Sequence, residues 1–109
     1  MRILGVIAKF ISPISTNIVV GHATTPFISA YSWTANGFGT KRADPATIPT
    51  FTPKSISFSP SGTDISVTHN GSPFVTIYPF NNGFGTKYAN PATMLTNGSL
   101  IVHLIQQEP

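Results

Sequence analysis

The sequence NGFGTK stands at residues 36–41 and returns unchanged at residues 82–87. A glycine-rich stretch of this kind can cradle a phosphate group or form a tight turn. A phosphate loop leads into a helix whose backbone amides face the anion, but neither copy is followed by a helical pattern, and Pro45 or Pro91 comes soon after. The stretch therefore predicts a turn in which Asn and Gly accept a positive φ. We expect its Phe to return to the core and its Thr-Lys pair to continue an outer strand.

The two copies belong to a longer internal repeat. Residues 12–33 align with residues 59–80 at an offset of 47, and residues 36–50 align with residues 82–96 at an offset of 46. Identical residues occupy 20 of the 37 aligned positions, which is far beyond chance for one chain compared with itself. The matched positions include Ile18 and Ile65, Val20 and Val67, His22 and His69, and Tyr31 and Tyr78. The chain is therefore built from one structural unit that is used twice.

Each unit has the pattern of a series of short strands. In the second copy, apolar residues alternate with Ser and Thr over residues 55–59 and 65–69, which is the period of a half-buried strand. An aromatic and β-branched run at residues 74–80 and a shorter run at residues 84–88 predict two further strands. Stretches rich in Pro, Gly, Asn and Ser between them predict tight turns. The sequence thus predicts an all-β fold of two tandem four-stranded antiparallel units.

We expect a single all-β domain over residues 1–109. Repeat one covers about residues 8–54, repeat two covers about residues 55–99, and residues 100–109 form a C-terminal strand and tail. The start of the chain is apolar but short, and Lys9 interrupts it. We therefore interpret the start as a strand rather than as a secretory signal.

The composition limits the classes of function. Of the 109 residues, 40% are hydrophobic and only 8% are charged, against roughly 25% charged residues in a typical globular chain. The formal net charge is +3, but the basic residues are scattered, so we do not expect nucleic-acid binding. There is no cysteine, which excludes disulfides and thiolate metal sites. No apolar run approaches the roughly 18 residues of a membrane span, so we expect no membrane partner.

A four-stranded unit of about 40–50 residues is typical of a β-propeller blade. The stretch SISFSPSGTDISV at residues 55–67 resembles the two innermost strands of WD-repeat blades. The motifs YSW, GFGTK and DPAT within residues 31–47, with YPF, GFGTKY and NPAT within residues 78–93, resemble a degenerate WD-like repeat of phage and environmental viral proteins. The resemblance covers about residues 8–97. No Trp-Asp dipeptide ends the third strand in either copy, so the hydrogen-bonded tetrad typical of WD blades is not expected.

The resemblance implies a propeller, but propellers need about 4–8 blades and this chain has two units. The two sheets can pack on each other as a small sandwich, or the chain can borrow blades from its neighbours. Three copies would give six blades, as in small trimeric propeller lectins built from two-blade chains. The strand-like ends at residues 1–7 and 99–105 either complete each other or complete a neighbour. We expect completion by homo-oligomerisation, for example as a trimer, or assembly with other virion proteins into a larger particle.

The acidic residues do not form a catalytic pair. Asp44 matches Asn90 in the repeat, Asp64 matches Asn17, and Glu108 lies in the tail. A paired-carboxylate hydrolase needs two carboxyl groups held on either side of one bond, and nothing in this pattern indicates such a pair. We therefore expect no enzyme, no catalytic residue and no cofactor.

The histidines offer a metal site only in principle. His22 and His69 share one position of the repeat, and His103 lies in the tail strand. A histidine repeated at a strand end is predicted to be a structural hydrogen-bonding group that closes the next turn, because its ring can donate one bond and accept another. No Ser-His-Asp arrangement stands out in a chain so rich in Ser. We expect no bound metal.

The aromatic residues of the third strand are the candidate residues for contact with a glycan or a partner. They are Tyr31, Trp33, Tyr78 and Phe80. Exposed rings beside Asn, Thr and Ser can stack on the face of a sugar, whereas buried rings can fill the space between blades. The repeat alone leaves both interpretations open.

Two main hypotheses of function follow. The first is a non-enzymatic structural or adhesive protein of a phage or virus-like particle, such as a decoration, fibre or tail component, located in the virion or outside the cell. The alternative is a small oligomeric β-propeller lectin that binds glycans. A third hypothesis is a piece of a longer propeller that scaffolds protein partners.

Overall fold

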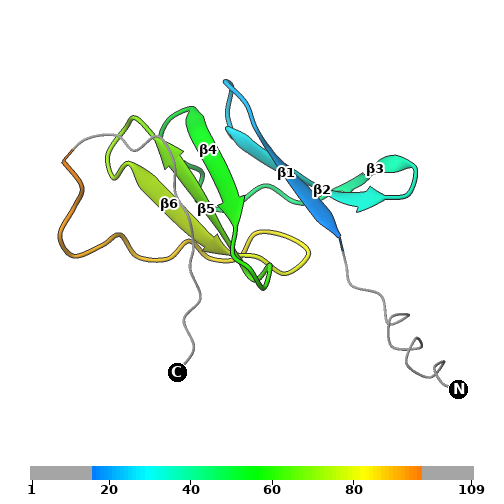
Figure 1. The fold of residues 1–109 in the computed structure, drawn as a ribbon. Helices are drawn as coiled ribbons and strands as arrows, with labels where there is room; N and C mark the ends of the chain where they lie inside the picture. Colours follow the sequence, from blue (N-terminus) through cyan, green and yellow to red (C-terminus); the bar gives the residue numbers. More distant parts are fainter. Residues whose placement is uncertain (1–15, 97–109) are drawn as a thin grey trace, which may run out of the picture.

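The computed structural model describes residues 16–96 of the chain. Six strands form two antiparallel sheets, each with its strands in chain order (Figure 1). The first sheet, called unit 1, contains β1 (Asn17–Gly21), β2 (Ile28–Thr34) and β3 (Gly37–Lys41). The second sheet, called unit 2, contains β4 (Pro53–Phe58), β5 (Asp64–His69) and β6 (Val75–Pro79). Residues 16–96 contain no helix, and so none that is long and apolar enough to cross a membrane.

The all-β class predicted from the sequence is confirmed. The predicted fourth strand of unit 2 is wrong, and the predicted first strand of unit 1 lies outside the described residues. Each unit has three paired strands, and the two units do not form a closed propeller. The strand predicted at residues 84–88 is reduced to a single bridge between Phe80 and Phe84. The counterpart of β4 in the first repeat falls before residue 16. The strands predicted at residues 1–7 and 99–105 also lie outside the described residues.

One difference between the two copies accounts for the reduced strand in unit 2. In unit 1 the Ser32 hydroxyl accepts a hydrogen bond from the Thr40 backbone N–H at 2.9 Å, where the register of β2 and β3 shifts. Pro79 occupies the equivalent position in unit 2 and has neither a hydroxyl nor a backbone N–H. The chain still follows the edge of β6, because the Tyr88 amide donates to the Ile77 carbonyl at 2.9 Å.

The NGFGTK stretch forms a turn, as the sequence predicts. Gly37 has a φ of +103°, and Asn82 in the second copy has a φ of +56°. The second glycine of the motif serves a different purpose. A Cβ at Gly39 or at Gly85 would run into the side chain of the facing residue on the neighbouring strand. The motif therefore combines a left-handed turn residue with a close approach of two strands.

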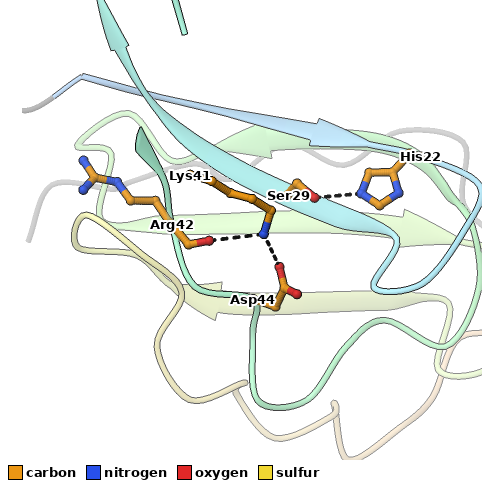
Figure 2. A network of polar contacts seen from close by, with 5 residues as sticks. All are labelled: His22, Ser29, Lys41, Arg42 and Asp44. Atoms are coloured by element: carbon orange, nitrogen blue, oxygen red, sulfur yellow. Dashed lines mark hydrogen bonds and ion pairs between the residues drawn. The ribbon is translucent and has the colours of Figure 1, made fainter. Parts of the chain in front are cut away.

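The lysine that ends the motif closes the following loop in both copies. Lys41 Nζ lies 2.6 Å from Asp44 Oδ1, as Figure 2 shows. Lys87 Nζ lies 2.7 Å from Asn90 Oδ1 in the same geometry. Because the carboxylate and the amide oxygen accept the same bond, the repeat is preserved in its contacts even where its residues differ.

The register of the paired strands divides the side chains of each sheet into two faces. The front of unit 1 carries Ile18, Val20, His22, Ser29, Tyr31, Trp33 and Phe38, and its back carries Val19, Gly21, Ile28 and Ala30. The front of unit 2 carries Ile65, Val67, His69, Thr76, Tyr78, Phe80 and Phe84, and its back carries Ser66, Thr68, Val75 and Ile77. The two fronts are equivalent by the repeat, and so are the two backs.

Unit 1 packs its back on the front of unit 2. Ile28 and Ala30, from the back of unit 1, belong to one buried cluster with Tyr78 from the front of unit 2. Gly21 permits the close approach, since a Cβ there would lie 3.0 Å from Ile56 Cδ1. Strands β1 and β4 are accordingly neighbours across the two sheets (Figure 1). The units thus follow each other face to back, like consecutive members of a stack.

The first prediction compares two equivalent phenylalanines, of which Phe84 packs on the Phe80 ring at a centroid distance of 5.3 Å and Phe38 is 60% exposed. Phe84→Ala should lower the free energy of unfolding by about 2–3 kcal/mol, because it removes a ring from the core. Phe38→Ala should cost less, about 1–1.5 kcal/mol, because its two edge-to-face contacts lie on an exposed face. Chemical denaturation of dilute protein measures both losses. Equal losses would contradict an open front in unit 1.

Candidate functional site

The four aromatic residues predicted as contacts lie in two environments. Tyr31 is half-buried and Trp33 is 43% exposed, both on the front of unit 1. Tyr78 and Phe80 hold the same places in unit 2 but are 0% and 4% exposed, because they belong to the core shared with unit 1. Of the four, Tyr31 and Trp33 are therefore the accessible pair. A glycan or partner contact through them stays a prediction.

Phe38 completes an aromatic group on the front of unit 1. Its ring centroid lies 5.1 Å from that of Tyr31 and 5.2 Å from that of Trp33, and both pairs meet edge to face. Such pairs add about 0.5–1.5 kcal/mol to the area they bury. The expectation that the motif's Phe returns to the core is wrong for Phe38 and right for Phe84, which packs against the core. The repeat indicates that Phe38 and Phe84 are equivalent, but it does not predict that the face around Phe38 is exposed.

A hollow of about 280 Å³ lies beside this aromatic group. It is lined by Val20, His22, Ser29, Tyr31 and Phe38. His22 Nε2 lies 2.9 Å from the Ser29 hydroxyl, and Figure 2 shows the ring pointing at that oxygen. The hollow is therefore lined mainly by apolar groups, with the Tyr31 phenol and one hydrogen-bonded histidine–serine pair. Its volume is at the lower end of the range for ligand pockets, which starts at roughly 300 Å³.

The front of unit 1 as a whole is an exposed apolar surface. Val20 is 36% exposed, and Trp33 and Phe38 are more exposed still. Apolar side chains that gather on one face, with a hollow among them, mark a contact surface more often than scattered apolar residues do. This face is the candidate functional site.

His69 is the structural hydrogen-bonding group that the sequence predicts. Its Nδ1 lies 2.8 Å from the Gly71 carbonyl, which only accepts, so Nδ1 carries the proton. Nε2 then accepts from the Thr76 hydroxyl at 2.8 Å. Burial lowers the pKa of His69, the bond to the Gly71 carbonyl opposes this, and the positive charge of Lys87 adds to the lowering. The ring is held neutral inside the fold and closes the turn that follows β5.

The carboxyl groups of the described residues serve local contacts. Asp44 pairs with Lys41 on the surface, and Asp64 accepts a hydrogen bond from the Tyr88 hydroxyl at 2.6 Å. That bond raises the pKa of the Tyr88 phenol. No group of three or more His, Asp or Glu side chains within residues 16–96 is placed to hold a metal ion. Glu108 and His103 lie outside the described residues, and the expectation of no catalytic or metal site stays a prediction.

A second and wider hollow of about 760 Å³ lies at the turns of unit 2. Asn17 of unit 1, Asn81 and Asn82 contribute amides to its wall, and Phe84 contributes a ring. Asn17 Nδ2 donates to Asn82 Oδ1 at 3.2 Å, which links the two units across the hollow. Amides beside an aromatic ring are chemically suited to hydroxyl-rich ligands.

Comparison of the chain with protein-family models, with characterised proteins and with solved structures gives no match in any of the three. The function is therefore argued from the geometry of the candidate sites. Two features carry that argument, namely the aromatic front of unit 1 and the amide-lined hollow of unit 2.

The second prediction concerns the pH dependence of stability. The folded-state pKa of His69 lies below the ordinary value of 6.5, so the unfolded chain binds the proton more readily. The free energy of unfolding should fall as the pH drops below about 6.5, until the pH passes the folded-state pKa. Denaturant titrations between about pH 7.5 and pH 5 measure it.

Two variants serve as controls for this pH dependence. His22→Gln should keep the decline, because it changes the half-exposed histidine of the equivalent pair. His69→Gln should be less stable throughout but should show a shallower decline. An unchanged slope in His69→Gln would contradict the assignment.

Proposed function

We propose that this chain is a non-enzymatic structural or adhesive protein that works by self-association. The observation that carries the proposal is the aromatic front of unit 1, which is open although its counterpart in unit 2 is buried in the core. Burying apolar surface contributes about 25 cal/mol for each Å² removed from water. A second protein surface that covers this front would therefore stabilise the assembly.

The strand edges support the same proposal. Among the described residues β1 pairs with β2 alone, whereas its counterpart β5 pairs with both β4 and β6. A strand supplied at the edge of β1 would complete unit 1 in the manner of unit 2. The proposed contacts thus combine an apolar face and a sheet edge.

The proposed setting is a phage or virus-like particle, in the virion or outside the cell. In this setting the chain is a decoration, fibre or tail component that binds its own copies, for example as a trimer of propeller-like units, and other virion proteins. This setting rests on the resemblance of the repeat to degenerate WD-like blades of viral proteins. The low charge and the many Ser, Thr and Asn residues fit a protein whose surfaces are engaged with other copies.

Glycan binding is the second candidate function, as in a small oligomeric β-propeller lectin. Two observations favour it: Trp33 is exposed beside another aromatic ring, and the hollow at the turns of unit 2 is lined by amides. Aromatic faces and amide groups together are the chemistry that recognises sugars.

The third prediction tests self-association. The full chain should show a mass that rises with concentration over the micromolar range in sedimentation or light scattering. Because the proposed contact is apolar, association should persist at about 1 M salt, where charge–charge contacts are screened within roughly 3 Å. A chain that stays monomeric throughout this range would overturn the proposal.

The fourth prediction tests glycan binding. If the chain is a lectin, a glycan array should show binding at millimolar sugar or below. Trp33→Ala should then reduce it at least about tenfold if the front of unit 1 is the site. Asn82→Ala should reduce it instead if the hollow of unit 2 is the site. Absence of binding to any glycan at that concentration would remove this candidate.

A further inference from the structure

We infer that the front of unit 1 docks on the back of unit 2 of a second copy of this chain. The contact would repeat, between two molecules, the face-to-back packing that joins the two units within one molecule. The inference rests on the proposed self-association and specifies the two surfaces that meet. It is carried by a comparison of burial at equivalent positions.

The first half of the comparison concerns the fronts. The hollow on unit 1 is lined by five residues, and each has an equivalent in unit 2. The pairs are Val20 and Val67, His22 and His69, Ser29 and Thr76, Tyr31 and Tyr78, and Phe38 and Phe84. In unit 2, Val67, His69 and Tyr78 are fully buried and Thr76 is 2% exposed. In unit 1, Val20 and Phe38 are 36% and 60% exposed, His22 and Tyr31 are half-buried, and only Ser29 is buried. The same kind of surface is therefore covered in unit 2 and partly open in unit 1.

On the backs the difference in burial is reversed, because there the residues of unit 1 are the buried ones. Three apolar pairs lie on or beside them: Ile28 and Val75, Ala30 and Ile77, and Pro45 and Pro91. The three residues of unit 1 are buried, while those of unit 2 are half-buried or exposed. Val75, Ile77 and Pro91 line a hollow of about 90 Å³ together with Lys87, Tyr88, Ala89 and Asn90. The back of unit 2 thus presents the apolar groups that unit 1 uses to cover a front.

The equivalent residues differ little in size. On the fronts Ser29 is one methyl group smaller than Thr76. On the backs Val75 is one carbon smaller than Ile28, and Ile77 is larger than Ala30. Ser66 and Thr68 are already buried on the back of unit 2, so the docking area centres on β6.

A second copy is the occupant because the molecule itself contains the matching pair of surfaces. The front of unit 2 shows what a front of this composition packs against. Its partners are the back of unit 1 and the loop after β3, where the Thr47 carbonyl accepts a hydrogen bond from the Tyr78 hydroxyl. A front-to-back contact uses different patches on the two partners. Such a heterologous contact generates a closed ring where the rotation closes and a filament where it does not.

The fifth prediction uses two variants that each block one surface. Val20→Glu places a charge on the front of unit 1, and Ile77→Glu places a charge on the back of unit 2. Either variant alone should associate at least about tenfold more weakly than the unchanged chain, because its charge would be buried without a partner. An equimolar mixture should form a species of two chains and stop there. In that species the intact back of unit 2 in Val20→Glu meets the intact front of unit 1 in Ile77→Glu.

A matched control tests whether the effect depends on where the charge is placed. Ser61→Glu adds the same charge at the exposed turn between β4 and β5, which belongs to neither surface, and should associate like the unchanged chain. Circular dichroism and Trp33 fluorescence report whether each variant is folded. Should Val20→Glu or Ile77→Glu unfold, the milder pair Phe38→Ser and Val75→Asn replaces them in the same mixing experiment.

The outcomes distinguish the inference from the function on which it rests. A monomeric unchanged chain would overturn both, and this includes the case in which the chain's own ends cover the front. An unchanged chain that associates, together with Val20→Glu that associates equally well, would overturn the inference and leave self-association standing. If Val20→Glu alone fails and Ile77→Glu alone still associates, the contact is front to front, which also overturns it. A capped two-chain species in the mixture, measured by sedimentation, supports it.

Discussion

A three-stranded sheet has two faces, and neither face can be buried by the sheet itself. In this chain one pair of faces is buried within the molecule. The back of unit 1, with Ile28 and Ala30, covers the front of unit 2, with Val67 and Tyr78. Fully burying an aliphatic or aromatic side chain is worth about 1.5–3 kcal/mol, so this contact is the main source of the core. Everything else in the structure depends on it. It orders the two units in one direction and leaves one front and one back at the ends.

The polar contacts inside the repeat are arranged to work in both a covered and an open unit. His69 and Thr76 form a buried pair at 2.8 Å, while His22 and Ser29 form the same pair at 2.9 Å on the open front. A buried polar group without a hydrogen-bond partner is costly. The histidine Nε2 has a hydroxyl partner both in the covered unit 2 and in the open unit 1. A front built in this way keeps its histidine–hydroxyl pair when it is covered, while the second ring nitrogen of His22 lacks the carbonyl partner that His69 has in Gly71.

The sequence predicted much of the local structure and little of what surrounds it. Alternation of apolar and small polar residues correctly indicated β5, and the NGFGTK turn and the hydrogen-bonding role of His69 also follow from local chemistry. The reduced fourth strand was not foreseen because it depends on Pro79, whose missing N–H and hydroxyl matter only beside a neighbouring strand. The different burial of Phe38 and Phe84 could not be predicted either. The two residues hold the same position in two identical copies of a six-residue motif. Their exposure differs only because the two units are packed differently.

The stack is also asymmetric in a way that bears on assembly. Stacked repeats that remain single molecules end in polar capping faces. The front of unit 1 is not such a cap, because Val20, Trp33 and Phe38 are exposed on it. The back of unit 2 is less open, because Ser66 and Thr68 are buried there and Val75 and Ile77 of β6 are half-buried. One end of the stack therefore has an exposed apolar face, and the other end has a complementary apolar face that is less exposed. This arrangement favours addition of further units in one direction over pairing of two equal ends.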